Sequence, residues 1–476
     1  MSSIFYGFEI AKSGLFAAQK ALDVISHNVA NADTPGYTRQ RVELSAKAPP
    51  TSLGMNDMYG QGRIGAGVDV TGINQIRDIF LDVQYRIENS LYGEWDAKTQ
   101  VLDSLEAIFN EPSDSGIATV IGEFFDAWEE LSKNPESLST RAVVREKGVA
   151  VVQTIRTTYT KLLDKRDEIN LNITTRIEEI NSYAKRIAEL NDQIYKFELN
   201  GDKANDLRDE RNLLLDKLSN LVNITSYEDS QGRMRVDIGG QALVDHTSYY
   251  EIEAQADPSD MNMVYPVWKD TGTAVNIKSG MLKGMLDARD GSGDPEYKGV
   301  KYYITEWNEF ASKFISEVNA IHETGYGLGS AGTGYLFFKG NGAMDIDISD
   351  DIKNDLNNIA AASVSDLPGD NSKALEMIAL RSDTSIFSEG SFEDFTRSLV
   401  SNLGVDTQQA EMMSENQSVL IQQIDNNRQS ISGVSLDEEM ADMVKYQHIY
   451  NAAARMITAI DEMIDTIVNK MGIVGR

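Results

Sequence analysis

The feature that most constrains the fold is a long apolar ladder near the N-terminus, over residues 4 to 29. Its apolar side chains recur at alternating steps of four and three, which is the spacing of a helix that lies in a coiled-coil seam. The ladder consists of Ile4, Phe8, Ala11, Leu15, Ala18, Leu22, Ile25 and Val29. Such a helix cannot bury its stripe alone, so the pattern predicts a partner helix.

A second periodic helix, residues 436 to 471, is the most natural partner, because it has neither Pro nor Gly before Gly472. One of its stripes comprises Leu436, Met440, Met443, Tyr450, Ala454, Ile457, Ile464, Val468 and Met471. A neighbouring stripe comprises Tyr446, Ala453, Met456, Ile460, Met463 and Ile467. A face of this width requires more than one neighbour. We therefore predict that the chain ends pair as a coiled coil and leave apolar surface for other subunits.

The middle of the chain is predicted to consist of helices on both sides of one β segment. The first helix stops at Asp33-Thr34-Pro35-Gly36-Tyr37, because Pro cannot continue a helix and Gly permits a turn. A loop-rich linker with one or two strands follows. Further helices are predicted over residues 76–109, 116–132, 139–199, 204–222, 279–288, 297–322 and 371–430, the last broken near Gly390, and short strands over 343–348 and 359–363.

These elements predict a mainly α fold in three parts. Residues 1–55 with 433–476 form a terminal coiled-coil polymerisation domain, and residues 56–222 with 281–432 form a rod-like body of long helices. Residues 223–280 form a small inserted β domain, since they are rich in Gly, Asp, Thr and Val and alternate in polarity.

Composition excludes several classes of function. The net charge of -30 opposes a nucleic-acid partner, and most of it belongs to the body. The absence of cysteine excludes disulfides and thiolate sites. No apolar run approaches the length of a membrane span, so we expect no membrane insertion. Glu9 and Lys12 interrupt the first apolar pattern, which argues against Sec-type export.

Motifs that resemble catalytic or ligand-binding sites have simpler explanations. GxGxxG occurs at Gly60–Gly65 and at Gly327–Gly332. Both lack the strand before and the helix after that dinucleotide binding needs, so we interpret them as loop glycines. Asp345, Asp347, Ser349 and Asp351 resemble a calcium loop without its Gly and final Glu, and a strand with solvated carboxylates is the better interpretation.

The four histidines are far apart in the sequence and form no metal-ligand motif. They are His27, His246, His322 and His448. The first and last lie on the terminal helices, where packing or capping explains them better than ligation. We therefore predict no catalytic residues, no cofactor and no metal site, and a protein that is not an enzyme.

The apolar stripes fit both the core of an ordinary helical bundle and a polymer-forming coiled coil. A family resemblance favours the coiled coil. One ten-residue segment resembles the signature of bacterial flagellar rod, hook and hook-associated proteins. It is Asn28-Val29-Ala30-Asn31-Ala32-Asp33-Thr34-Pro35-Gly36-Tyr37. Thr38-Arg39-Gln40 looks like the hook-associated members. Residues 432–440, 451–454 and 205–211 are similar to other stretches of the same proteins. The signature residues carried over are Asn28, Asn31, Thr34, Pro35, Gly36 and Tyr37.

The resemblance implies a structural subunit at the junction between flagellar hook and filament. It implies a ring of copies, with hook protein and a second junction protein (hook-associated protein 3) as neighbours. It also implies a cytoplasmic export chaperone on the C-terminal helix, type III export without a cleaved signal, and a secreted location in the flagellum. The ladder residues at both ends would then be the subunit-assembly residues.

The residues add a physical expectation of their own. Terminal helices with unburied stripes are marginal in water, so we expect them to be largely disordered in the monomer and to order on assembly. Strong protection of residues 4 to 29 from amide exchange in the free chain would contradict this. The alternatives are another axial protein of the hook or distal rod, flagellin, or a secreted helical adhesin.

Overall fold

The computed structural model describes residues 4–48, 65–109, 116–229, 231–293, 297–329 and 332–470, and it confirms a mainly α fold. The chain forms two compact units. The first comprises Met1–Asn89, Ile180–Glu251 and Val419–Arg476, and the second comprises Ser90–Glu179 and Ile252–Ser418. Three helices contribute residues to both units: α2 (Ile79–Phe109), α4 (Leu138–Glu198) and α10 (Phe392–Ser432).

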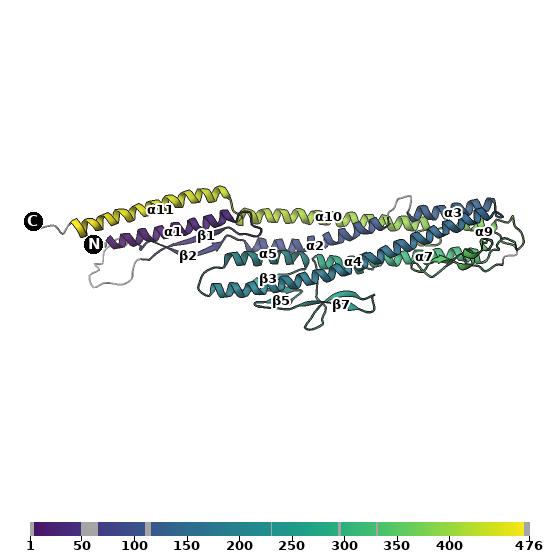
Figure 1. The fold of residues 1–476 in the computed structure, drawn as a ribbon, viewed down its shortest axis with the longest axis horizontal. Helices are drawn as coiled ribbons and strands as arrows, with labels where there is room; N and C mark the ends of the chain where they lie inside the picture. The colour runs from purple at the N-terminus through teal and green to yellow at the C-terminus, as the bar shows by residue number, and fades with distance from the viewer. Residues whose placement is uncertain are drawn as a thin grey trace, which may run out of the picture. The chain divides into compact units, whose positions relative to one another are not determined.

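The first unit contains the paired chain ends and a small sheet. Its remaining elements are α1 (Ile4–Ala30), β1 (Gln40–Ala46), β2 (Val68–Gln75), α5 (Asn205–Leu221), β3 (Thr225–Glu228), β4 (Met234–Ile238), β5 (Gln241–Asp245), β6 (Ser248–Tyr249) and α11 (Leu436–Asp465), which continues as one π-helical stretch over Thr466–Lys470. Figure 1 shows α11 running beside α1, and the two helices are in contact along their length.

A β hairpin covers the second face of α1. Strands β1 and β2 pair antiparallel from Gln40 opposite Gln75 to Ala46 opposite Val68, with a bulge between Glu43 and Leu44. Together the helix and the hairpin bury an apolar cluster of Ala21, Val24 and Val42, against which Val70, Ile73 and Tyr446 pack. The predicted linker strands therefore cover a part of α1 that α11 does not cover.

Local signals set the helix ends as the sequence predicted. Gly36 lies at φ +81° in the turn after α1, and Gly390 lies at φ +121° before α10, a backbone region that favours glycine. Ser435 caps α11 by accepting a hydrogen bond from the backbone N–H of Glu438. Three carboxylates in the first turn of α11 complement the helix dipole.

The second unit is a helical body around an aromatic core. Its own elements are α3 (Ile117–Lys133), β7 (Ile252–Asp257), β8 (Met263–Trp268), α6 (Met281–Asp290), α7 (Val300–Glu323), β9 (Phe338–Lys339), β10 (Asp347–Ile348), α8 (Asp350–Asn354), a 3-10 turn (Leu356–Asn358) and α9 (Ser372–Leu380). Phe124, Phe310 and Phe314 are fully buried. The rings of Phe310 and Trp307 stack with centroids 5.2 Å apart, so α7 supplies the middle of this core.

His322 has the packing role expected of a buried histidine. One ring nitrogen, Nδ1, lies 2.6 Å from the carbonyl oxygen of Tyr335, and the other, Nε2, accepts a hydrogen bond from the backbone N–H of Ala360 at 2.9 Å. Burial lowers the pKa of His322 to about 4, so the ring is neutral at pH 7. It joins α7 to two loops rather than to a ligand.

The β elements differ from the predicted ones. Strands β3 to β6 form a four-stranded sheet in the first unit, whereas β7 and β8 form a hairpin in the second. A separate β domain at residues 223–280 therefore stays a prediction, and the boundary between the two compact units falls inside this range, between Glu251 and Ile252. Within residues 343–348, Asp347 and Ile348 are the strand, and residues 359–363 contain an isolated bridge from Ala362 to Tyr326.

Other motifs from the sequence are placed as follows. Residues 60–64 of the first GxGxxG lie outside the described residues, as do Ser330 and Ala331 of the second. Asp345 accepts hydrogen bonds from the backbone N–H groups of Asn341 and Gly342, which makes it a turn residue. In the part of the chain that the structure describes, no helix is both long and apolar enough to cross a bilayer.

Candidate functional site

The face of α1 that is buried is broader than the predicted ladder. Ala11, Ala18 and Ile25 of the ladder are buried, and Phe8, Leu15 and Leu22 are half-buried. Three buried apolar residues lie outside the ladder: Ala17, Ala21 and Val24. Val29, its last position, is exposed, and the adjacent Asn28 is buried in its place. The face is broad because α11 and the hairpin cover α1 from two sides.

The predicted residues of α11 divide into a packed and an exposed group. Met443, Tyr450, Ala454, Ile457 and Ile464 are half-buried, whereas Leu436, Met440 and Val468 are exposed. From the neighbouring stripe, Ile460 is buried beside Gly7 of α1. Met456, Met463 and Ile467 are exposed. Helix α11 therefore keeps exposed apolar side chains outside its packed face.

A buried asparagine begins the polar network at the base of the terminal helices. Asn28 is fully buried and uses both ends of its amide. Its Nδ2 donates to the carbonyl oxygen of Gln40 at 2.9 Å and to Oε2 of Glu439 at 3.1 Å. Its Oδ1 accepts from the Tyr37 hydroxyl at 2.8 Å and from the backbone N–H of Gln40 at 3.0 Å. This one side chain thus fixes the signature turn to α11.

An ion pair joins the same turn to the start of α11. Arg39 donates from Nε to Glu439 and from Nη1 to Glu438, each at 2.6 Å, and its backbone N–H donates to the carbonyl oxygen of Ser432 at 2.8 Å. Burial disfavours the charge on Arg39, but these carboxylates outweigh it and raise the pKa. The side chain of Glu439 is 2% exposed, against 64% for Glu438. Loss of the buried Glu439 carboxylate would therefore lower stability much more than loss of the exposed Glu438 carboxylate.

Helix α5 supplies the third side of the network. Asp209 accepts from the backbone N–H of Thr38 at 3.0 Å and from Gln75 at 2.7 Å. Asp206 accepts from Gln40 at 2.7 Å. Burial raises the pKa of Asp209 to about 6, although these hydrogen bonds and the nearby Arg77 favour the carboxylate.

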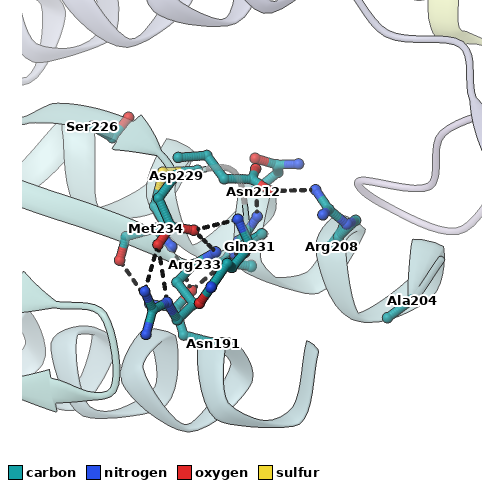
Figure 2. Close-up of polar contacts among 12 residues, drawn as sticks. Asn191, Ala204, Arg208, Asn212, Ser226, Asp229, Gln231, Arg233 and Met234 are labelled. Atoms are coloured by element: carbon teal, nitrogen blue, oxygen red, sulfur yellow. Dashed lines mark hydrogen bonds and ion pairs between the residues drawn. The ribbon is translucent and has the colours of Figure 1, made fainter. Parts of the chain in front are cut away.

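Polar contacts connect α5 to α4 and to the small sheet, and Figure 2 shows those around Asn191, Asp229 and Met234. Arg211 of α5 is buried and donates to the carbonyl oxygen of Gly232 at 2.7 Å and to Asn191 at 2.9 Å. Asn191 also binds both backbone groups of Met234. In the turn, Asp229 accepts from the backbone N–H groups of residues 231 and 233. Helices α4 and α5 and the small sheet thus form one supported platform.

The signature residues have two kinds of environment. Asn28 and Tyr37 belong to the network, and burial raises the pKa of Tyr37. Asn31 donates to the carbonyl oxygen of His27, ending the helix. Thr34, Pro35 and Gly36 are exposed. With residues 428–435, this turn lines a groove of about 520 Å³.

Sequence reasoning did not identify Glu439 and Asp209 as site residues. The signal was present, because Glu439 stands four residues before Met443 and so occupies the buried face of α11. A carboxylate in an apolar stripe requires a buried partner. That partner, Arg39, is 400 residues away in the chain, and spacing alone could not reveal it. Among the described residues, no group of three His, Cys, Asp or Glu could hold a metal ion.

Models of known protein families match three parts of the chain. Residues 102–338 match the flagellar hook-associated protein FlgK helical domain. Residues 8–38 match the flagella basal body rod protein family, and residues 425–471 match the flagellar basal body rod FlgEFG protein C-terminal family. The two rod-family segments contain most of α1, the signature turn and α11, which are elements that meet in the network.

Full-length relatives carry one name. Flagellar hook-associated protein 1 of Bacillus subtilis (strain 168) is 33% identical, with 100% of this chain and 100% of that protein covered. The Escherichia coli (strain K12) protein of the same name is 26% identical, with 96% and 98% covered. The flagellar hook junction protein FlgK from Burkholderia pseudomallei shares the fold, with a TM-score of 0.61, 15% identity, and 74% and 100% covered. The chain therefore belongs to the flagellar hook-associated protein 1 family.

Proposed function

We propose that this chain is the structural subunit that joins the flagellar hook to the filament, and that it assembles through its N- and C-terminal helices after type III export. The observation that carries the proposal is the convergence of three distant segments, the signature turn, the start of α5 and the start of α11, in one buried polar network. This network fixes both chain ends to one platform, which is what a subunit that polymerises through its ends requires.

The proposed partners follow from the surfaces that the terminal helices leave free. Exposed apolar residues on both helices, such as Phe5, Phe16 and Met456, support contact with further copies in a ring. Hook protein and hook-associated protein 3 would be the neighbours along the axis, and a cytoplasmic chaperone would cover α11 before export. The protein would pass through the cytoplasm and reside outside the cell, with no enzymatic activity.

We expect the terminal helices to order on assembly. In the free chain, amide exchange of residues 4 to 29 should be fast, because exposed apolar side chains of α1 and α11, such as Phe5, Phe16 and Met456, lack a partner until other copies supply one. Exchange measured by mass spectrometry on the monomer and on isolated flagella tests this. Strong protection of those residues in the monomer would contradict it.

Electron microscopy of a strain that lacks the gene tests the proposed function. Complete hooks without filaments, with unassembled flagellin in the medium, are the expected result. Absent hooks would place the chain in the rod or hook instead, which the rod-family segments at both ends also fit. Intact flagella would contradict an axial role, and the alternative of a secreted helical adhesin would then be favoured.

A further inference from the structure

Three polar atoms in the interior of the second unit lack a hydrogen-bond partner. They are the hydroxyl oxygens of Tyr297 and Tyr303 and Oδ2 of Asp406, and within the described ranges no protein group forms a hydrogen bond with them. Tyr297 lies just before α7, Tyr303 lies near the start of α7, and Asp406 lies on α10. Buried polar groups in native proteins are almost always hydrogen-bonded, so these three atoms require a partner.

Electrostatic effects show that the three groups are neighbours. Burial is the largest cause that raises the pKa of both phenols, and the negative charge of Asp406 is the next. The Tyr297 phenol also acts on Tyr303. Both hydroxyls therefore keep their protons at pH 7 and are donors, whereas Oδ2 of Asp406 is an acceptor.

The Tyr303 hydroxyl is held in the interior by the packing of its ring. Tyr303 is 0% exposed. Its ring packs against those of Phe109 and Tyr302, with centroids 5.8 and 5.2 Å away. The hydroxyl therefore has no route to bulk solvent, and its partner has to lie inside the unit.

The charges beside the three atoms restrict what that partner is. Nζ of Lys298 lies 3.4 Å from Oδ2 of Asp406. Nζ of Lys98 lies 4.9 Å above the Tyr297 ring and is held by two carboxylates at 2.6 and 3.0 Å. Two ammonium groups thus lie next to the cluster, and they would repel a bound cation.

A water molecule has the hydrogen-bonding groups that this cluster needs. Its oxygen accepts one hydrogen bond from each phenol, and one of its protons is donated to Oδ2 of Asp406. Internal waters typically make about three hydrogen bonds, to polar groups that would otherwise be unpaired. An apolar group would satisfy none of the three atoms, and a cation could accept nothing from the two hydroxyls.

We propose that the second unit binds one internal water molecule through the hydroxyls of Tyr297 and Tyr303 and Oδ2 of Asp406. The water joins the start of α7 to α10 by three hydrogen bonds. It is a structural ligand of the helical body, and it does not depend on which part of the flagellum the chain forms. Both hydroxyls then stabilise the body although neither contacts a protein partner.

Tyr303→Phe tests the sign of the hydroxyl's contribution. If the hydroxyl binds the water, its removal should raise the unfolding equilibrium constant about fivefold, because a net hydrogen bond is lost. If the hydroxyl has no partner, the same substitution should lower that constant, because an unpaired buried group disappears. Denaturant unfolding of the full chain, followed by tryptophan fluorescence, measures the effect, since all four tryptophans lie in the second unit.

Tyr302→Phe is the matched control, because it removes a hydroxyl from the adjacent, half-buried tyrosine. It should change the unfolding constant by no more than about a factor of two. An effect equal to that of Tyr303→Phe would overturn the assignment, since loss of any phenol hydroxyl at this place would then destabilise the unit.

The double variant Tyr297→Phe/Tyr303→Phe tests whether one molecule serves both hydroxyls. Its effect should be smaller than the product of the two single effects, because the first loss already weakens the binding of the shared water. Fully independent effects would show that the hydroxyls have separate partners and would overturn the proposal.

A crystal structure of the full chain at a resolution that shows ordered water identifies the ligand. We expect one density peak at hydrogen-bond distance from all three oxygens. A direct hydrogen bond from either hydroxyl to Asp406, without such a peak, would overturn the proposal. Unfolding that depends on sodium at constant ionic strength would indicate a bound cation and would overturn it as well.

Discussion

Replacing Glu439 by Ala is expected to abolish incorporation of the chain into flagella and to stop swimming. The substitution removes one of the two acceptors of the buried Asn28 Nδ2 and leaves Arg39 paired only with the exposed Glu438. Removing one partner of a buried ion pair costs up to about 3–5 kcal/mol, which lowers the folded population of the terminal region by a factor of up to roughly 10² to 10⁴. Swimming in soft agar and the amount of chain on isolated flagella measure the effect.

Glu438→Ala is the matched control for this substitution. Glu438 binds the same guanidinium at the same 2.6 Å, but its side chain is 64% exposed. Loss of an exposed pair costs about 1 kcal/mol or less, so swimming should be nearly normal. If the two variants behave alike, burial of Glu439 is not what fixes the chain ends. Equal total amounts of both variants outside the cell, on flagella and in the medium together, would show that export is unaffected.

Shortening or charging Ile460 is expected to separate α11 from α1. Ile460 is buried where the backbone of Gly7 approaches, and a Cβ at Gly7 would lie 3.6 Å from its Cδ1. Ile460→Val should lower the free energy of unfolding by about 1 kcal/mol and Ile460→Ala by about 2–5 kcal/mol, because the cavity grows with each lost methyl group. Ile460→Asp should cost still more, since it buries an unpaired charge.

The graded series is the control for this prediction. Swimming and retention on flagella should fall in the order Ile, Val, Ala, Asp. Ala459→Asp adds the same charge at the neighbouring exposed position, and it should leave the packing of α1 against α11 intact. A normal level of retention for Ile460→Asp would show that the two helices need not pair in the assembled flagellum.

Part of the terminal site was predictable from the sequence. The apolar ladders of α1 and α11 predicted that the chain ends pair, and the turn after α1 was predicted from Pro35 and Gly36. Both signals are local, since helix periodicity and backbone preference act over a few residues. The exposed methionines on α11 were likewise expected from a stripe wider than one partner helix can cover.

The tertiary structure decided which residues of those ladders are buried. The side of α1 that carries Ala21 and Val24 is buried because a hairpin formed by residues 40–46 and 68–75 covers it. The ladder ends on Asn28 instead of Val29, because a helix with 3.6 residues per turn drifts from a strict seven-residue repeat. No local pattern shows where a distant hairpin will lie.

The sequence by itself thus determined the helices, their ends and the pairing of the termini, and its resemblance indicated the family. The tertiary structure alone decided that Asn28, Arg39, Asp209 and Glu439 meet. These residues come from three regions separated by more than 160 positions, and a buried polar group is stable where several partners converge at hydrogen-bond distance. That convergence depends on the path of the whole chain, which no single segment encodes.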